Sequence, residues 1–259
     1  MKPGKSPRIE TLESSGRAAP LSNLFPRTLN KCLDFTRRLL PQHCLLCGAG
    51  RTDGPVCAPC LADLPWLSRA ACVVCATPLE TGVICGRCLD RPPRFDRVDA
   101  VFAYRYPVNA LIHAFKYGGR LALARALGKL LASRVARDDD GDVDALVPMP
   151  LARERLAERG FNQALEVARV VSDVTGLPLW IHACRKVANT PPQAALPWQE
   201  RAKNVRRSFV CDADLDGRRV AVVDDVLTTG STLDELARVL KRAGATEVRG
   251  WVVARTLPR

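Results

Sequence analysis

Two adjacent acids followed by a hydroxyl-rich turn are the residues of this chain that are best placed to do chemistry. Residues 222–232 read VVDDVLTTGST, so an apolar strand leads directly into Asp224 and Asp225. Gly230 lets a phosphate approach the backbone of the turn, and the amides at the start of the next helix favour an anion. Four hydroxyl groups line the same turn, those of Thr228, Thr229, Ser231 and Thr232. Two carboxylates beside such an anion cradle suit a sugar whose hydroxyls lie next to its phosphate.

The elements that must position these groups are a strand over 219–223 and an amphipathic helix from about Ser231. Ser231, with Asp234 three residues later, predicts a capping box at the start of the helix. The competing interpretation is an ordinary strand–turn–helix corner with an acidic turn. Because the apolar strand, the acid pair, the TTG turn and the capped helix occur in order, we favour the sugar-phosphate site.

The segment resembles the phosphoribosyl-pyrophosphate (PRPP) signature of type I phosphoribosyltransferases. The resemblance implies that the two acids hold the 2′- and 3′-hydroxyls of a ribose and that the following loop holds its 5′-phosphate. The implied PRPP-binding residues are Asp224, Asp225, Val226, Leu227, Thr228, Thr229, Gly230, Ser231 and Thr232.

Eight of the eleven cysteines fall into two identical Cys-x2-Cys-x9-Cys-x2-Cys frames. The frames contain Cys44, Cys47, Cys57 and Cys60, and then Cys72, Cys75, Cys85 and Cys88. Two Cys-x-x-Cys turns complete a tetrahedral shell of four thiolates, so the pattern predicts a double zinc ribbon with two structural Zn²⁺ ions. Disulfides would need an oxidising compartment, and a redox dithiol needs one such turn rather than four. The repeated spacing favours sequential over interleaved pairing. Cys32, Cys184 and Cys211 are expected to be plain thiols.

Composition points to an anionic partner and to a location in the cytoplasm. The chain of 259 residues has a formal net charge of +12, which favours a phosphorylated metabolite or nucleic acid; a solvated basic surface is the alternative. No apolar run approaches the ~18–20 residues of a membrane span. The first residues lack the apolar segment of a secretory leader.

The sequence predicts three parts. Residues 1–40 comprise a disordered tail and a short helix at 31–40. Residues 41–92 form the double zinc ribbon, in which the metal supplies the folding energy because the residues between the knuckles are small and polar. Residues 93–259 form a phosphoribosyltransferase-like domain.

Strands and helices alternate after residue 95, which predicts an α/β fold with a parallel sheet covered by helices on both faces. Ligands of such sheets bind at the carboxyl ends of strands, where the acid pair lies. The expected strands are 98–106, 144–148, 219–223 and 246–254. The expected helices are 108–117, 121–136, 162–175 and 231–243.

Two further basic stretches are expected to border the same crevice. The loop after the second expected strand contains Arg153, Arg155 and Arg159, whose planar guanidinium groups match phosphate. Lys116 and Arg120 flank a Gly-Gly turn. Solvated arginines and an exposed helix lysine are the alternatives.

Residues 189–207 are polar and Pro-rich, and they resemble the mobile hood loop of this fold, which closes over the reacting centre. The candidate contact residues of this flexible loop are Gln193, Arg201 and Asn204. A disordered linker is the alternative.

Residues 40–257 as a whole resemble the ComF family (competence protein ComFC and GntX-like proteins). The resemblance depends on the order of the double CxxC frame, LIHAFKYGGR, VPMPL, RGFNQ, TPPQ and VVDDVLTTGST. It implies a zinc ribbon joined to a phosphoribosyltransferase-like domain, and a link to the uptake or handling of transforming DNA in bacteria.

The implied chemistry is displacement at the anomeric carbon of PRPP, or of another phosphorylated ribose compound, with pyrophosphate leaving. Mg²⁺ would bridge pyrophosphate and ribose oxygens. The implied catalytic residues are Asp224 and Asp225, which orient the ribose, and Arg159 or Lys116, which stabilises the charge of the leaving group. Purine-type enzymes carry an acid where this chain has Thr228, so the pattern is closer to orotate-type enzymes and leaves the acceptor open.

Two non-catalytic interpretations also remain open. Residues 91–137 carry ten basic side chains against two acids, which indicates a surface for single-stranded DNA. In the other interpretation the chain senses PRPP, and its zinc ribbon docks competence or replication proteins.

Overall fold

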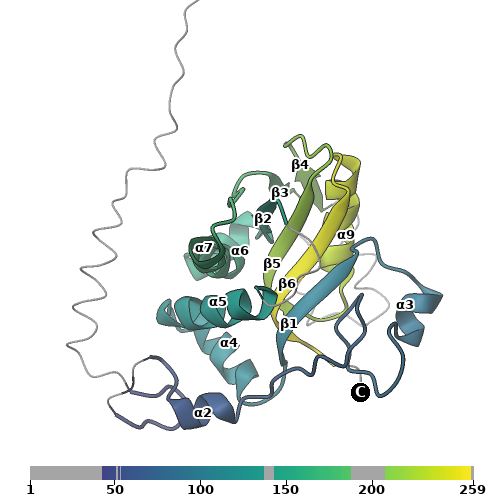
Figure 1. Cartoon of the computed structure of the whole chain (residues 1–259). Helices are drawn as coiled ribbons and strands as arrows, with labels where there is room; N and C mark the ends of the chain where they lie inside the picture. Colours follow the sequence, from purple (N-terminus) through teal and green to yellow (C-terminus); the bar gives the residue numbers. More distant parts are fainter. Residues whose placement is uncertain (1–42, 51, 53, 137–142, 188–207, 258–259) are drawn as a thin grey trace, which may run out of the picture. The chain divides into compact units, whose positions relative to one another are not determined.

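A computed structural model describes residues 43–50, 52, 54–136, 143–187 and 208–257 of the chain (Figure 1). The predictions for the tail and short helix within 1–40, and for Cys32, lie outside the described residues.

Four parallel strands form the central sheet. They are β1 (Arg97–Ala103), β2 (Ala145–Pro148), β5 (Arg219–Leu227) and β6 (Glu247–Arg255), in the order β1-β6-β5-β2. The expected strands are all present, but β1 ends at Ala103 rather than at residue 106, and β5 continues past Val223 to Leu227. Asp224 and Asp225 therefore lie within a strand and do not belong to the turn. Backbone pairing with β6 continues along this extension, with Asp224 opposite Val252 and Val226 opposite Ala254.

Helices cover both faces of the sheet, as predicted (Figure 1). Alternate residues of β5 belong to two separate apolar cores, with Val220 and Val222 on one face and Ala221 and Val223 on the other. The first core includes helix α9 (Ser231–Arg242). The second core includes α4 (Val108–Tyr117), α5 (Ala122–Val135) and α7 (Gln163–Thr175). None of the helices in the described ranges has both the length and the apolar character that a bilayer crossing requires.

The boundaries of these four helices agree with the predictions to within one residue. An additional helix, α6 (Arg153–Arg159), occupies the segment that the sequence predicts to be a loop. Its residues RERLAER are good helix formers, and Gly160 ends the helix in the left-handed conformation, at φ 77°. The prediction fails because two turns of mainly charged residues show no apolar periodicity.

The predicted capping box at the start of α9 is wrong. Gly230, at φ 86°, is the N-cap, and the described residues supply no side-chain cap. Asp234 instead accepts hydrogen bonds from the backbone amide and the guanidinium of Arg94, at 2.6 and 2.8 Å. The left-handed conformation open to glycine lets the chain turn one residue before Ser231.

A short antiparallel hairpin packs on the α9 side of the sheet. It consists of β3 (Cys184–Lys186) and β4 (Phe209–Cys211), with Cys184 directly opposite Cys211. Both cysteines are free thiols, as predicted. The predicted hood-loop residues lie between the two strands and outside the described residues; they are Gln193, Arg201 and Asn204.

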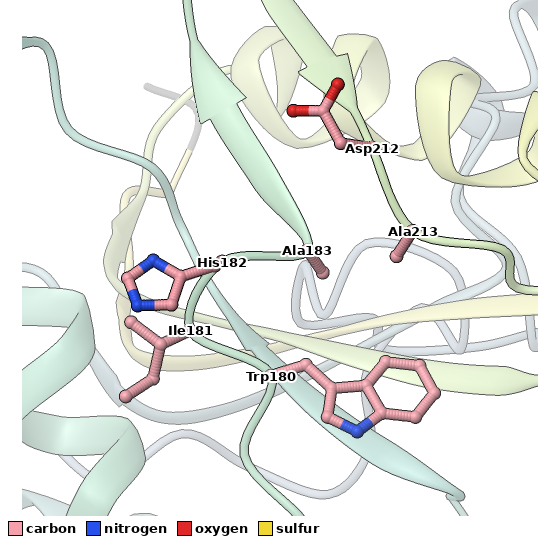
Figure 2. Close-up of a pocket in the computed structure, with 6 residues that line it drawn as sticks. All are labelled: Trp180, Ile181, His182, Ala183, Asp212 and Ala213. Atoms are coloured by element: carbon pink, nitrogen blue, oxygen red, sulfur yellow. The ribbon is translucent and has the colours of Figure 1, made fainter. Parts of the chain in front are cut away.

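An open hollow of about 360 Å³ lies at the end of the hairpin away from Lys186. It is lined by Trp180, Ile181, His182, Ala183, Asp212 and Ala213 (Figure 2). The rings of Trp180 and His182 come from the segment that enters β3, whereas Asp212 follows β4. No residue predicted for the sugar-phosphate site lines this hollow. Those residues lie instead near the carboxyl ends of the parallel strands.

Candidate functional site

The eight cysteines of the two frames form two separate clusters, one for each frame. Within each cluster all four Sγ atoms lie within 4.8 Å of one another. Cys47 Sγ is 3.7 Å from Cys57 Sγ, and Cys75 Sγ is 3.6 Å from Cys85 Sγ. Sulfurs bound at ~2.3 Å to a tetrahedral zinc ion lie about 3.8 Å apart. Both clusters therefore fit Zn²⁺, and the thiols are grouped within each frame, as predicted.

The two ribbons repeat the same backbone pattern. In each, the amide of the third cysteine donates to the sulfur of the first, Cys57 to Cys44 at 3.4 Å and Cys85 to Cys72 at 3.3 Å. Amide donors favour the thiolate form, which is the form that binds zinc. The same contact in both frames supports a duplicated metal-binding unit.

Burial distinguishes the two clusters. In the second cluster only Cys85 is not buried, whereas in the first only Cys44 is buried. The second ribbon contributes Ala76 to the core that contains α9. The first ribbon packs Leu45 and Leu46 against the opposite core. Each ribbon is therefore held against a different face of the α/β domain.

The acid pair lies at the carboxyl end of β5. Asp225 is 7% exposed, and its Oδ1 is 2.9 Å from Lys116 Nζ. The Asp225 amide donates to Asp224 Oδ1 at 2.8 Å. Burial and the Asp225 charge raise the pKa of Asp224 to about 7, although the ammonium groups of Lys116 and Lys186 oppose the shift. A carboxyl group perturbed by burial and by a specific neighbour is typical of functional sites.

Lys116 reaches the acid pair from the last turn of α4. Its side chain is only 21% exposed. Burial lowers the pKa of Lys116, but the carboxylates of Asp225 and Asp224 together outweigh burial and the resulting shift is upward. Lys116 is therefore held as a cation in the site. Arg120, the other basic residue predicted at the Gly-Gly turn, is exposed.

Arg159, the last residue of α6, points toward the same end of α4. Its guanidinium donates to Gln163 Oε1 at 2.9 Å and to the Tyr117 hydroxyl at 3.2 Å. It also lies 5.1 Å from the centroid of the Tyr117 ring. The charge of Arg159 lowers the pKa of Lys116, so the structure brings these two predicted cations together near the acid pair.

The other two arginines of α6 are arranged differently. Arg153 is exposed, which agrees with the alternative of a solvated arginine. Arg155 is half-buried, and its charge lowers the pKa of Lys186. Arg155 therefore contributes positive charge on the hairpin side of the site.

Sequence reasoning misses Lys186, the last residue of β3. Burial and Arg155 lower the pKa of Lys186, whereas Asp224 raises it, so the lysine lies within electrostatic reach of the acid pair. Its ammonium group is 5.7 Å from the centroid of the Phe209 ring. No motif marks this lysine. Only the pairing of β3 with β4 brings it to the strand ends, and strands of three residues leave no periodicity to recognise.

The loop from Thr228 to Gly230 joins β5 to α9 and is held by local hydrogen bonds between Thr229 and Ser231. Thr229 Oγ1 accepts a hydrogen bond from the Ser231 amide at 3.1 Å and is 2.8 Å from Ser231 Oγ. Gly230 is left-handed, at φ 86°. The N-terminus of α9 follows at once and carries partial positive charge. The glycine turn and the helix start that the sequence predicts are present, and anion binding there stays a prediction.

The parallel sheet and the loop at the end of β5 define an α/β protein of the phosphoribosyltransferase type. The two cysteine clusters add a double zinc ribbon to it. The family models agree with this class: "Phosphoribosyl transferase domain" matches residues 160–257, and "Double zinc ribbon domain" matches residues 35–89. The chain belongs to the ComF family, whose members include competence proteins and DNA utilization proteins.

Three relatives illustrate this membership. DNA utilization protein YhgH of Escherichia coli K12 is 36% identical over 179 residues, which cover 64% of this chain and 75% of the relative. Competence protein F of Haemophilus influenzae is 34% identical over 171 residues, which cover 63% and 74%. Competence protein ComFC of Bacillus subtilis is 27% identical over 158 residues, which cover 61% and 63%.

The similar solved structures have lower sequence identity to this chain. The purine phosphoribosyltransferase of Pyrococcus horikoshii is 22% identical with a TM-score of 0.30, over 51% of this chain and 81% of that chain. The glutamine PRPP amidotransferase of Bacillus subtilis is 23% identical with a TM-score of 0.34, over 49% of this chain and 25% of that chain.

Proposed function

We propose that this protein binds PRPP at the carboxyl end of β5 and acts as a phosphoribosyltransferase. The observation that carries the proposal is the order of groups along one stretch of backbone. Two acids lie in the last part of β5, an anion-favouring loop follows the strand, and Lys116 contacts the second acid at 2.9 Å. This order matches the order of groups on a ribose 5-phosphate, in which hydroxyls and phosphate are a few bonds apart.

Asp224 and Asp225 would form hydrogen bonds with the ribose 2′- and 3′-hydroxyls. An ionised carboxylate is a strong acceptor, and a protonated carboxyl group can also donate. Amides and hydroxyls from Thr228 to Thr232 would hold the 5′-phosphate at the start of α9. Gly230 would allow close approach of the phosphate to the backbone.

Lys116 and Arg159 would bind the pyrophosphate end of PRPP. Lys116 pairs with Asp225, so the two charged groups hold each other in position for a substrate. The oxygen ligands of the two carboxylates suit Mg²⁺, which supplies charge neutralisation of the pyrophosphate when it is bound.

The proposed reaction is a substitution at C1 of the ribose. A nucleophile on the acceptor forms a bond to C1, and the bond from C1 to the pyrophosphate oxygen breaks, so that its electron pair leaves with pyrophosphate. Fixed cations beside the leaving group would stabilise the developing negative charge. Thr228 replaces the acid of purine-type enzymes, which favours an acceptor other than a purine.

Calorimetric titration tests the proposal, with PRPP and Mg²⁺ added to the zinc-loaded protein. We expect micromolar binding that disappears in Asp224→Ala/Asp225→Ala. Asp214→Ala/Asp216→Ala is a matched control, because these two exposed acids precede β5 at the opposite end of the sheet. Absence of binding by the wild type, or equal loss in the control, would contradict the proposal.

A second function, binding of single-stranded DNA, is favoured by one surface. Tyr106 lies just before α4 and Tyr117 is its last residue, and they are 75% and 57% exposed. Arg105 and Arg120 are exposed beside them. Exposed aromatic rings interleaved with basic side chains form stacking platforms for unpaired bases.

Titration of a fluorescent oligothymidine at several salt concentrations tests this second function. We expect affinity to fall steeply with salt and to fall about tenfold in Tyr106→Ala, because base stacking on one ring is lost. No binding at low salt would exclude this surface as a DNA site.

A further inference from the structure

Arg255 connects the second zinc ribbon to the phosphate loop. It is the last residue of β6, pairs in register with Leu227 of β5, and is only 1% exposed. Its Nε donates to the Cys75 carbonyl at 2.9 Å. Its Nη1 donates to the Leu227 carbonyl at 3.1 Å and to the Thr228 carbonyl. One rigid guanidinium therefore holds a zinc-binding knuckle and the first peptide groups of the loop in a fixed relation.

The buried charge of Arg255 makes this connection electrostatic as well as geometric. A buried cation is destabilising unless negative charge lies nearby. Four thiolates around Zn²⁺ carry a net double negative charge, and the Cys75 peptide that Arg255 contacts belongs to such a cluster. The zinc-bound state of the second ribbon thus supplies the charge that a buried guanidinium needs at this position.

The residues that follow the second ribbon contact the loop at two more points. The ring of Phe95, which is 4% exposed, packs beside Gly230, since a Cβ built on Gly230 would lie 3.5 Å from it. Arg94 binds Asp234 in the first turn of α9 through its amide and its guanidinium. The start of the loop, its glycine and the first helical turn are therefore all supported from this one side.

The first ribbon provides an internal comparison with the same local structure. The residue after the second cysteine is left-handed in both ribbons, Gly48 at φ 75° and Ala76 at φ 55°. Ala76 packs in the core that contains Leu227, whereas the first ribbon packs on the opposite core through Leu45 and Leu46. Similar metal-binding units are thus attached to different parts of the domain.

We propose that zinc in the second ribbon, acting through Arg255, sets the conformation of the phosphate loop and thereby controls anion binding there. Arg255 is a positioning residue in this scheme. The inference rests on the phosphate site proposed above, but loop conformation can be measured without any ligand.

Hydrogen–deuterium exchange of the loop amides in the full chain tests the coupling. Cys85→Ser disrupts the second ribbon, and Cys57→Ser is its counterpart in the first, because each is the half-buried N-cap of a short helix, α3 (Gly86–Asp90) and α2 (Ala58–Ala62) respectively. We expect exchange over 227–232 to accelerate about tenfold or more in Cys85→Ser, as local opening becomes easier, and to stay unchanged in Cys57→Ser. Equal exchange in the two variants would overturn the proposal.

Arg255→Lys provides a second measurement that keeps the charge but removes the planar fork. We expect a chelator to extract the zinc ion of the second ribbon ~10–100-fold faster than from the wild type. Loss of a group that hydrogen-bonds beside a metal ligand typically weakens metal affinity by this factor. The loop amides should also exchange faster than in the wild type. Unchanged zinc release together with unchanged loop exchange would contradict the role of Arg255.

Titration of PRPP with Mg²⁺ into the wild type, Cys57→Ser and Cys85→Ser separates this inference from the proposed function. Binding by the wild type and Cys57→Ser, with loss in Cys85→Ser, is expected. Equal binding by both cysteine variants would refute the coupling and leave the proposed function intact. Absence of binding by the wild type would refute the proposed function, and the exchange rates would still decide the coupling.

Discussion

Lys116 Nζ lies 2.9 Å from Asp225 Oδ1, and this ion pair joins the last turn of α4 to the carboxyl end of β5. The two side chains are 21% and 10% exposed. Removing one partner of a buried pair leaves a charge that has neither its partner nor water. Breaking the pair would therefore weaken the docking of α4, and the intact pair keeps a cation beside the proposed ribose site.

Substitution of Lys116 should reveal this dual role. We expect Lys116→Met to lower the free energy of unfolding by about 1–3 kcal/mol, because Asp225 is left unpaired. The double variant Lys116→Met/Asp225→Asn should recover part of that loss. Urea unfolding of the wild type, the two single variants and the double variant measures the coupling. Strictly additive effects would show that the two groups do not interact in solution.

The raised pKa of Asp224 predicts a specific dependence of stability on pH. Its pKa is about 7 in the folded protein, against an ordinary value of 3.8, so the folded state retains a proton that the unfolded state releases. This contribution to stability is complete below the unfolded value and disappears as the pH rises through about 7. We expect the unfolding free energy of the wild type, relative to Asp224→Asn, to fall between about pH 4 and about pH 7. A difference that is constant or rises with pH would contradict the raised pKa.

Gly230 offers a test of the loop itself. Gly230→Ala places a Cβ on a residue at φ 86°, which should lower stability by about 1–2 kcal/mol. Gly217→Ala is the matched control, because Gly217 has φ 70° with open space around it and precedes β5 at its other end. Both variants should lose similar stability in thermal unfolding, but only Gly230→Ala should lose PRPP affinity. Equal affinities would place the phosphate elsewhere.

Zinc content tests the pairing of the cysteines. Cys44→Ser/Cys47→Ser removes two ligands of one cluster, and elemental analysis should find one zinc ion per chain instead of two. Cys47→Ser/Cys75→Ser removes one ligand from each cluster, and both ions should then be easily extracted by a chelator. Loss of both ions from the first variant would contradict separate clusters.

The sequence predicts the parts of the site that are local in the chain. The acid pair, the loop and the cysteine frames are contiguous motifs whose geometry depends on a few neighbouring residues. The structure groups the cysteines as expected, and it places the acids and the loop next to each other near the end of β5, although the strand extends further than predicted. The ion pair of Lys116 with Asp225 and the approach of Lys186 depend on how distant elements pack, so single-sequence patterns do not contain them. The predicted capping box fails for a related reason, since Asp234 is bound by Arg94 from a remote segment.

The domain boundaries at 92 and 93 stay a prediction, as do the individual roles assigned to the site residues. The contacts of Arg255 show why boundaries are difficult to read from sequence here. A buried side chain of β6 donates to a carbonyl of the second ribbon, so the composition changes at residue 92 but the packing does not end there.

The strand order means that the central sheet can be completed only late in the synthesis of this protein. β6 lies between β1 and β5, yet it follows both of them in the chain. On the ribosome, the backbone edges of β1 and β5 that face β6 must therefore stay unpaired until residues 247–255 are made, and exposed strand edges of this kind are prone to aggregate. Chains interrupted before β6 should depend strongly on chaperones, whatever the state of their zinc ribbons.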